Sequence, residues 1–209
     1  QKGPIWWASH HRHHHQYSDT PEDIHPPYIY GLYWAHVGWI MSSQYLKPRL
    51  ELVRDLLKFP EIRWLDDYHY IPPIVLAVAV YLFGVFCEMY FPGLGTNGWQ
   101  MLVWGFFVST VLLYHGTFSI NSLSHMLGDR RFNTTDHSKN NFWLALITLG
   151  EGWHNNHHRY PGSERQGFYW WEIDISHYIL KALSWVGLVW DLRTPPERIY
   201  REATETQAS

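Results

Sequence analysis

Three groups of residues have the types and spacing of metal ligands. Two are histidine boxes, H-R-x-H-H at residues 11–15 and H-x-x-H-H at residues 154–158, and the third is an N-x-x-x-H pair. Positions i, i+3 and i+4 share one face of an α-helix, so each group can direct its side chains to one point. An expression tag would not be interrupted by Arg12, nor would it recur at residues 154–158. The candidate ligands are His11, His14, His15, Asn121, His125, His154, His157 and His158.

The number and type of these ligands favour two metal ions over one. Seven imidazoles and a carboxamide exceed the four ligands of a single zinc ion, and imidazole suits iron, copper, zinc and nickel. The single cysteine, Cys87, excludes a multi-thiolate site. Each ligating ring should also have its second nitrogen held by a carboxylate, a carbonyl or water. The acidic residues near the motifs are Asp19, Asp23, Asp136 and Glu151.

Composition and two apolar runs place these motifs at a membrane. The chain has 13 Trp and 14 Tyr, which concentrate at membrane interfaces. Residues 71–87 and 99–124 lack Asp, Glu, Lys and Arg and are joined by a short turn. They predict a hairpin of transmembrane helices over 71–91 and 99–120, with two buried helices of a soluble core as the alternative. A net charge of -3 excludes nucleic acid as a partner.

A hairpin returns the chain to the side it left, so all three ligand groups share one face of the membrane. Basic residues flank the hairpin and none lies in its turn, which makes this face cytoplasmic. Residues 141–153 and 173–190 predict interfacial helices, and the polar tail, residues 195–209, is expected to fray. The expected fold is all-α and integral to a membrane. A transmembrane helical hairpin carries a cytosolic helical cap with the histidine boxes, in one catalytic domain over residues 1–209.

The runs around these motifs resemble one known family. Residues 6–19 (WWASHHRHHHQYSD), 34–39 (WAHVGW), 121–125 (NSLSH) and 150–158 (GEGWHNNHH) are similar to acyl-CoA desaturases of the stearoyl-CoA, delta-9 type. Motif order and intervals agree over nearly the whole chain. The resemblance implies a mushroom-shaped fold with four membrane helices under a cytosolic cap, an all-histidine di-iron centre and a kinked tunnel for the acyl chain.

The resemblance also assigns roles to single residues. The seven histidines would bind iron, Asn121 would act through a water, and Trp7 and Thr117 would shape the kink of the tunnel. Tyr30 stands where relatives carry a basic residue for the CoA phosphates, and Arg12 is a candidate to replace it. The family's H-x-x-x-x-H box and two further membrane helices have no counterpart here. We therefore expect an N-terminally incomplete chain that is inactive alone.

The expected function is O2-dependent desaturation of a long-chain acyl thioester, acyl-CoA, at the delta-9 position. Its cofactors would be two iron ions (Fe2+/Fe3+), because redox chemistry in a membrane favours iron. The sequence has no flavin, nicotinamide, Fe–S or haem motif, so a separate cytochrome b5 or ferredoxin must supply electrons. The location would be a bacterial inner membrane or the endoplasmic reticulum, with the catalytic face cytoplasmic. Two alternatives stay open: a membrane hydroxylase or alkane monooxygenase, and a non-enzymatic membrane protein that binds metal or haem.

Several other patterns are interpreted as structural. The G-x-G-x-x-G match at residues 93–98 follows a membrane helix instead of a strand and is taken as a turn. The glycosylation sequon at residues 133–135 faces the cytoplasm in this topology and should be unused. Asp66 and Asp67 are interpreted as a solvated loop. Structural roles are also expected for His36, His69, His115 and His177.

Overall fold

The computed structural model describes residues 2–208, with side chains as far as residue 204. The chain divides into two compact units, which are described separately. Unit 1 comprises residues 1–13 and 42–115, and unit 2 comprises residues 14–41 and 116–209. Helices and turns make up the described part of the chain, which contains no strand. The expected all-α class is therefore confirmed.

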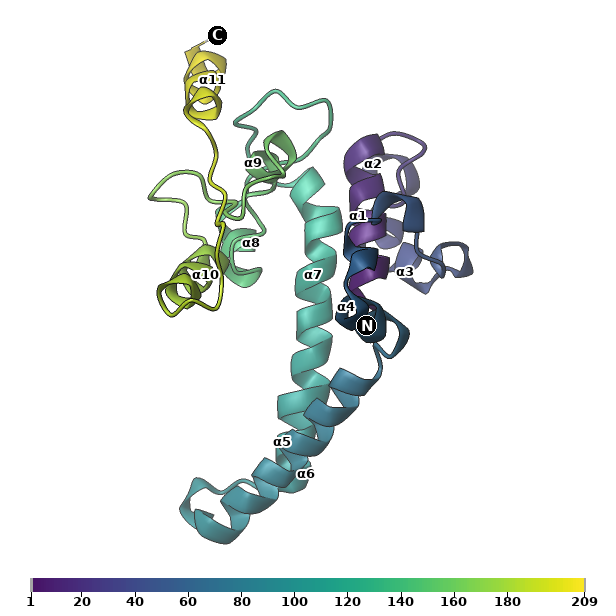
Figure 1. Cartoon of the computed structure of the whole chain (residues 1–209), viewed down its shortest axis with the longest axis vertical. Coiled ribbons are helices and arrows are strands. Elements are labelled where there is room, and N and C mark those ends of the chain that lie inside the picture. Colours follow the sequence, from purple (N-terminus) through teal and green to yellow (C-terminus); the bar gives the residue numbers. More distant parts are fainter. Residues whose placement is uncertain (1, 209) are drawn as a thin grey trace. The chain divides into compact units, whose positions relative to one another are not determined.

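A helical hairpin dominates unit 1 (Figure 1). Its first arm is α5 (Ile71–Tyr90), and its second arm begins with α6 (Gly98–Leu102) and a π-helical segment, η6 (Val103–Val108). The second arm continues as α7 (Ser109–Met126), which runs on into unit 2. Prolines occupy the first turn of α5, where no intrahelical donor is needed. The side chain of Asn97 caps α6 by accepting a hydrogen bond from the Gln100 N–H, 2.9 Å away.

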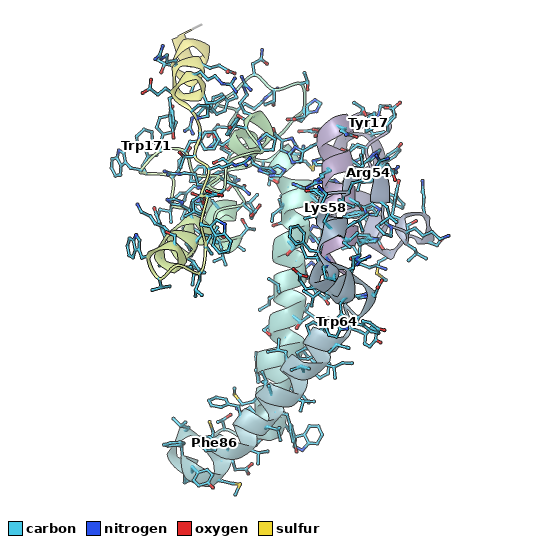
Figure 2. All side chains as sticks on the ribbon, viewed as in Figure 1. Tyr17, Arg54, Lys58, Trp64, Phe86 and Trp171 are labelled. Atoms are coloured by element: carbon cyan, nitrogen blue, oxygen red, sulfur yellow. The ribbon has the colours of Figure 1, made fainter. Side chains whose placement is uncertain are left out.

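Both arms have the length and composition of membrane-spanning helices. Ile71–Tyr90 has 20 residues, and the continuous second arm, Gly98–Met126, has 29. Only 11% of the most apolar stretch of the first arm and 6% of that of the second are buried within the protein. Helices in the core of a soluble protein would be mostly buried, so these exposures favour the membrane interpretation. Figure 2 shows Phe86 near the turn of the hairpin and Trp64, Arg54 and Lys58 toward its other end.

The two arms approach closely near the turn. Gly84 of α5 lies so near the start of α6 that a Cβ atom there would sit 2.6 Å from the carbonyl oxygen of Asn97. The rings of Tyr81 and Trp99 pack edge to face beside this contact, with centroids 5.1 Å apart. Small residues allow such close backbone approach in membrane helix pairs. Gly84 is therefore a packing position of the hairpin.

The rest of unit 1 consists of short helices and one unexpected helix cap. The helices are η2 (Ser43–Tyr45), η3 (Leu50–Leu52), η4 (Leu56–Lys58) and α4 (Pro60–Asp67). Asp66 Oδ1 accepts hydrogen bonds from the backbone N–H groups of Ile5 (2.9 Å) and Trp6 (3.0 Å) in the first turn of α1 (Pro4–Tyr17). A carboxylate there satisfies free donors and favours the helix dipole. The interpretation of Asp66 as part of a solvated loop is therefore wrong.

Unit 2 also contains several helices besides its parts of α1 and α7, and one of them, α9, carries the candidate ligands His154, His157 and His158. These helices are α2 (Pro27–Tyr30), the π-helical η1 (Trp34–Gly38), α3 (Trp39–Met41), α8 (Phe142–Ile147), α9 (His154–Arg159), α10 (Ile175–Trp185) and α11 (Glu197–Ala208). The apolar segments 141–153 and 173–190 form shorter helices than expected, because positive-φ residues follow α8 at Leu149 and Gly150 and α10 at Gly187. Asn141 and Asp174 cap the starts of the two helices. Their faces expose large side chains, including Trp143 and Trp185. Interfacial placement stays a prediction.

The C-terminal segment differs from the expected frayed tail. Helix α11 buries Ile199 and Ala203 in an apolar cluster with Phe132 and Phe168. The two buried residues are four apart and so share one helix face. The carboxylate of Glu202 also pairs with the Arg159 guanidinium at the end of α9. The expectation of fraying, which considered only the polarity of the tail, is therefore wrong.

Candidate metal centre

The candidate ligands lie mainly in the last turns of three helices. The backbone at a helix C-terminus carries a partial negative charge, which favours a nearby cation. Histidines cluster at the ends of α1, α7 and the short α9. These last-turn histidines are His14, His15, His125, His157 and His158.

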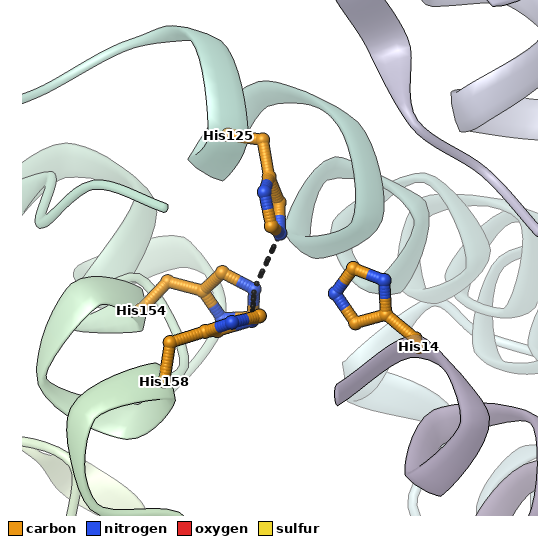
Figure 3. A group of neighbouring side chains, drawn as sticks. All are labelled: His14, His125, His154 and His158. Carbon is orange, nitrogen blue, oxygen red and sulfur yellow. Dashed lines mark hydrogen bonds between the residues drawn. The ribbon is translucent and has the colours of Figure 1, made fainter. Parts of the chain in front are cut away.

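Four histidines from these helices converge on one point in unit 2. Their side chains face one another (Figure 3), and one ligand nitrogen of each lies within 4.8 Å of the others. His154 Nε2 is 3.1 Å from His125 Nε2 and 3.0 Å from His158 Nε2. Two imidazoles bound to one ion at about 2.1 Å would be separated by about 3.0–3.4 Å. The spacing in this group, completed by His14, therefore fits a shared metal ion.

Carboxylates hold the opposite ring nitrogens of three of these histidines. The pairs are His14 Nδ1 with Asp23 (2.9 Å), His125 Nδ1 with Asp19 (2.8 Å) and His158 Nδ1 with Asp136 (2.8 Å). An Nδ1–H donated to a carboxylate leaves the Nε2 lone pair for a metal and fixes the ring orientation. The sequence named all three aspartates as candidates for this role. Glu151, the fourth candidate, instead accepts a hydrogen bond from Gln166.

The electrostatics of the group also suit a cation. Burial, followed by the neighbouring imidazoles, holds the pKa of His14 and of His154 well below the usual histidine value. Both rings are therefore neutral at pH 7 and keep a lone pair for a metal. Burial raises the pKa of Asp23 to about 7. Burial would also raise the pKa of Asp19, but hydrogen bonds from His125 and the His137 backbone outweigh it and lower the pKa.

A second pair of imidazoles lies beside this group. His15 Nε2 is 2.9 Å from His157 Nε2, and the His15 ring lies 4.4 Å from that of His158. His11 precedes His15 by one turn of α1, as the spacing of the box requires. The donor set on this side is again imidazole, which suits a second ion of the same kind.

Asn121 also has a feature that fits a metal site. It lies one turn before His125 on α7, and its Nδ2 atom is buried with no hydrogen-bond partner in the protein. A buried amide donor of this kind is normally satisfied. A water molecule on a nearby ion would provide an acceptor, in line with the sequence expectation.

The predicted substrate residues are placed differently. Trp7 is half-buried on α1 in unit 1, and Thr117 is half-buried on α7 in unit 2. Arg12 makes a two-point ion pair with Asp55, at 2.6 and 2.8 Å, so its charge is largely neutralised. Tyr30 is half-exposed. The roles of these residues in substrate binding stay predictions.

Sequence reasoning missed several buried residues around the centre. His25 is buried with its ring centroid 4.4 Å from that of His14, and with Asp23 these residues form a further group of close ligand atoms. His25 has no helical spacing to either box, so periodicity could not find it. Asn155 and Asn156 lie inside the second box and are fully buried, but the motif reading gave them no role.

Comparison with known proteins decides the family. A profile described as fatty acid desaturase matches residues 3–190. The chain belongs to the fatty acid desaturase family. The chain is 40% identical over 200 residues to an acyl-CoA C20 delta-5 desaturase of Anemone leveillei, covering 94% of the chain and 60% of that relative. It is 39% identical over 200 residues to the delta-9 acyl-lipid desaturase 1 of Arabidopsis thaliana, covering 94% and 61% respectively.

A cyanobacterial relative extends this range. The sn-1 stearoyl-lipid 9-desaturase of Synechocystis is 34% identical over 198 residues, which cover 94% of this chain and 58% of the relative. The chain thus spans about three-fifths of the length of these relatives. Their names differ in acyl carrier and in double-bond position. The comparisons therefore show a member of the fatty acid desaturase family without fixing its substrate.

Proposed function

We propose that this protein is the di-iron part of an O2-dependent desaturase that acts on a long-chain fatty acyl group. The observation that carries the proposal is the convergence of four histidines, with the Nε2 atoms of His125 and His158 next to that of His154, while three Nδ1 atoms are held by aspartates. Two iron ions would be held by His11, His14, His15, His125, His154, His157 and His158, with Asn121 acting through a water. Bound iron would supply the oxidising power needed to break unactivated C–H bonds.

The residues of the chain then have defined tasks. The aspartates keep each Nδ1 protonated and each Nε2 available, and the buried surroundings exclude bulk water from the imidazoles. The reaction removes two hydrogens from neighbouring methylenes while O2 is reduced to two waters. Two of the four electrons come from the substrate and two from a separate donor of the cytochrome b5 or ferredoxin type. A membrane location with the histidine boxes on the cytoplasmic face belongs to the same proposal.

For the substrate we propose acyl-CoA, desaturated at the delta-9 position, on the sequence resemblance. One observation favours an acyl-lipid as second candidate. The charge of Arg12 is paired with Asp55, and Tyr30 occupies the position where a base for the CoA phosphates is expected. A glycerolipid substrate would not require those positive charges.

Product analysis tests these proposals. Full-length protein, loaded with iron in membranes and given a reductant system and a saturated C18 acyl chain either as CoA thioester or within glycerolipid, should form a monounsaturated product with one carrier. Gas chromatography with mass spectrometry locates the double bond. A hydroxylated product would support the monooxygenase alternative, and a Soret band would support a haem protein. His157→Ala should give no product.

The variant Tyr30→Arg tests directly whether the acyl carrier is CoA. If CoA phosphates bind near this position, an added guanidinium should lower KM for acyl-CoA and leave kcat nearly unchanged, which is the pattern of uniform binding. Tyr30→Phe is the matched control, because it removes only the hydroxyl that donates to the Pro21 carbonyl. An unchanged KM for acyl-CoA would count against CoA binding at this position.

A further inference from the structure

One loop is hydrogen-bonded directly to one ligand histidine and, through Asp19, to a second. Residues 129–140 form a loop closed by paired backbone hydrogen bonds between Asp129 and Asn140, at 2.9 and 2.7 Å. The loop carries Asp136, the partner of His158 Nδ1. Its His137 N–H also donates to Asp19 Oδ2 (2.7 Å), the same oxygen that accepts from His125 Nδ1. The conformation of this loop therefore bears on the orientation of two ligands.

The second oxygen of Asp136 is held from within the loop. Asp136 Oδ1 accepts hydrogen bonds from the Thr134 hydroxyl (2.9 Å), the Ser138 N–H (2.9 Å) and the Ser138 hydroxyl. These donors turn the carboxylate so that Oδ2 faces His158. Asp136 is itself almost fully buried. A change in either hydroxyl would therefore alter the aim of the carboxylate without touching a ligand.

Asn155 anchors these hydroxyls. It lies on α9 beside His154 and is fully buried. Its Oδ1 accepts from the backbone N–H groups of Arg131 (2.9 Å) and Phe132 (2.7 Å), which can only donate. That fixes the orientation of the amide, so Nδ2 is the group facing the Phe132 carbonyl oxygen (3.2 Å) and the Thr134 and Ser138 hydroxyls (each 3.3 Å).

Asn155 and the Asp136 carboxylate together set the directions of the hydrogen bonds between them. Because Nδ2 can only donate and an ionised carboxylate can only accept, the two hydroxyls accept from Nδ2 and donate their own hydrogens to Asp136. Asp136 is then an acceptor on Oδ1, and its Oδ2 accepts from the Nδ1–H of His158. His158 is left with its Nε2 lone pair directed at the other imidazoles. A single buried amide thus helps to aim the carboxylate that selects the tautomer of His158, a ligand three hydrogen bonds away.

We propose that Asn155 is a positioning residue of the metal centre, which acts through Thr134, Ser138 and Asp136 to fix the tautomer and orientation of His158. The inference rests on the proposed function, because it requires that the histidines bind a metal. The competing interpretation is that Asn155 only fastens the loop to α9 for folding. The two interpretations predict different effects on metal binding when only the Nδ2 donor of Asn155 is removed.

The test is a Co2+ titration of the purified chain in detergent, followed by visible absorption and by competition with a chelator. Asn155→Asp keeps the acceptor for the Arg131 and Phe132 N–H groups but removes the Nδ2 donors. We expect it to weaken Co2+ binding about tenfold, the lower end of the range for groups behind a ligand, and to alter the ligand-field bands. Asn133→Asp, the same change at an exposed residue of the same loop, should behave as wild type.

A second pair of variants distinguishes a role of the Thr134 hydroxyl in metal binding from a role of Thr134 in folding. Thr134→Val removes the hydroxyl at nearly constant shape and should weaken Co2+ binding, whereas Thr134→Ser keeps the hydroxyl and should restore it. If Asn155→Asp and Thr134→Val only lower the melting temperature of the metal-free protein, with Co2+ affinity and spectrum unchanged, the proposal is overturned. Failure of the wild type to bind Co2+ would contradict the metal centre of the proposed function, and this inference with it.

Discussion

At the scale of single residues, Asn121 and His157 should respond differently to removal. In the full-length protein we expect His157→Ala, which deletes a direct ligand, to leave well under two irons per chain and no turnover. Asn121→Ala should keep part of the iron but slow desaturation by about 10–100-fold, the usual effect of a group that acts from behind the ligands. Iron analysis and product formation in the same preparations measure both effects. Wild-type values for Asn121→Ala would mean that its buried Nδ2 has no part in the centre.

The residues that could be predicted from the sequence are those related by local spacing. Helical periodicity grouped the histidines of each box, and Asp23 follows the first box closely enough to fold back on His14. Asp19 instead pairs with the distant His125, so spacing could name it as a candidate but not give its partner. Contacts between distant segments could not be predicted in this way. Asp66 caps a helix that begins about 60 residues earlier in the chain. The carboxylate of Glu151 accepts a hydrogen bond from Gln166 instead of pairing with a ligand histidine. The position of His25 next to His14 likewise depends on the turn between them.

At the scale of elements, the hairpin depends on one close contact. Gly84→Ala would place a Cβ 2.6 Å from the Asn97 carbonyl oxygen, so the arms must separate. We expect a lower thermal stability of the purified protein in detergent, measured by tryptophan fluorescence. Gly116→Ala is the matched control, since a Cβ there meets nothing within 4 Å and alanine is the better helix former. Equal stability of the two variants would show that the arms do not pack as described.

Hydropathy located the helices of the hairpin but not the ends of the shorter helices. The second arm is longer than the predicted 99–120 because its polar end, which carries Asn121 and His125, continues the same helix. Segments 141–153 and 173–190 contain shorter helices because residues with positive φ, Leu149 and Gly150 after α8 and Gly187 after α10, end each helix early. The sequence did not predict helix α11, because only two of its residues are buried in the apolar cluster and the rest of the segment is mostly polar. Such docking depends on Phe132 and Phe168, which lie far away in the sequence.

At the scale of the whole molecule, the hairpin predicts a membrane topology that can be measured. Cys87 is the single cysteine and is buried, so a Cys87→Ser background accepts single reporter cysteines. Exposed positions are Lys58 before the hairpin, Leu94 in its turn and Thr194 after it. In intact cells an impermeant maleimide should label Leu94→Cys but not Lys58→Cys or Thr194→Cys. Labelling of all three, or of Thr194→Cys alone, would contradict the hairpin topology.

Metal removal should affect the stability of unit 2 as a whole. Its cluster of buried apolar side chains is small, namely Phe132, Phe168, Ile199 and Ala203. Much of what it buries is polar, including His14, His125 and His154. Without an ion, Nε2 atoms only about 3 Å apart must share protons instead of ligating a cation. An ion that binds only the folded chain stabilises it by about 2.7 kcal/mol at a hundred times its Kd.

We therefore expect Co2+ or Zn2+ to raise the melting temperature of chelator-treated protein in a concentration-dependent way. Mg2+, which prefers oxygen ligands, should not. His125→Ala removes one of the converging imidazoles and should abolish most of the shift, whereas His69→Ala removes an exposed histidine bonded to a backbone carbonyl and should leave it intact. The measurement is thermal unfolding in detergent at fixed pH. An equal shift with Mg2+, or a shift that survives His125→Ala unchanged, would show that the stabilising ion binds somewhere other than the histidine group.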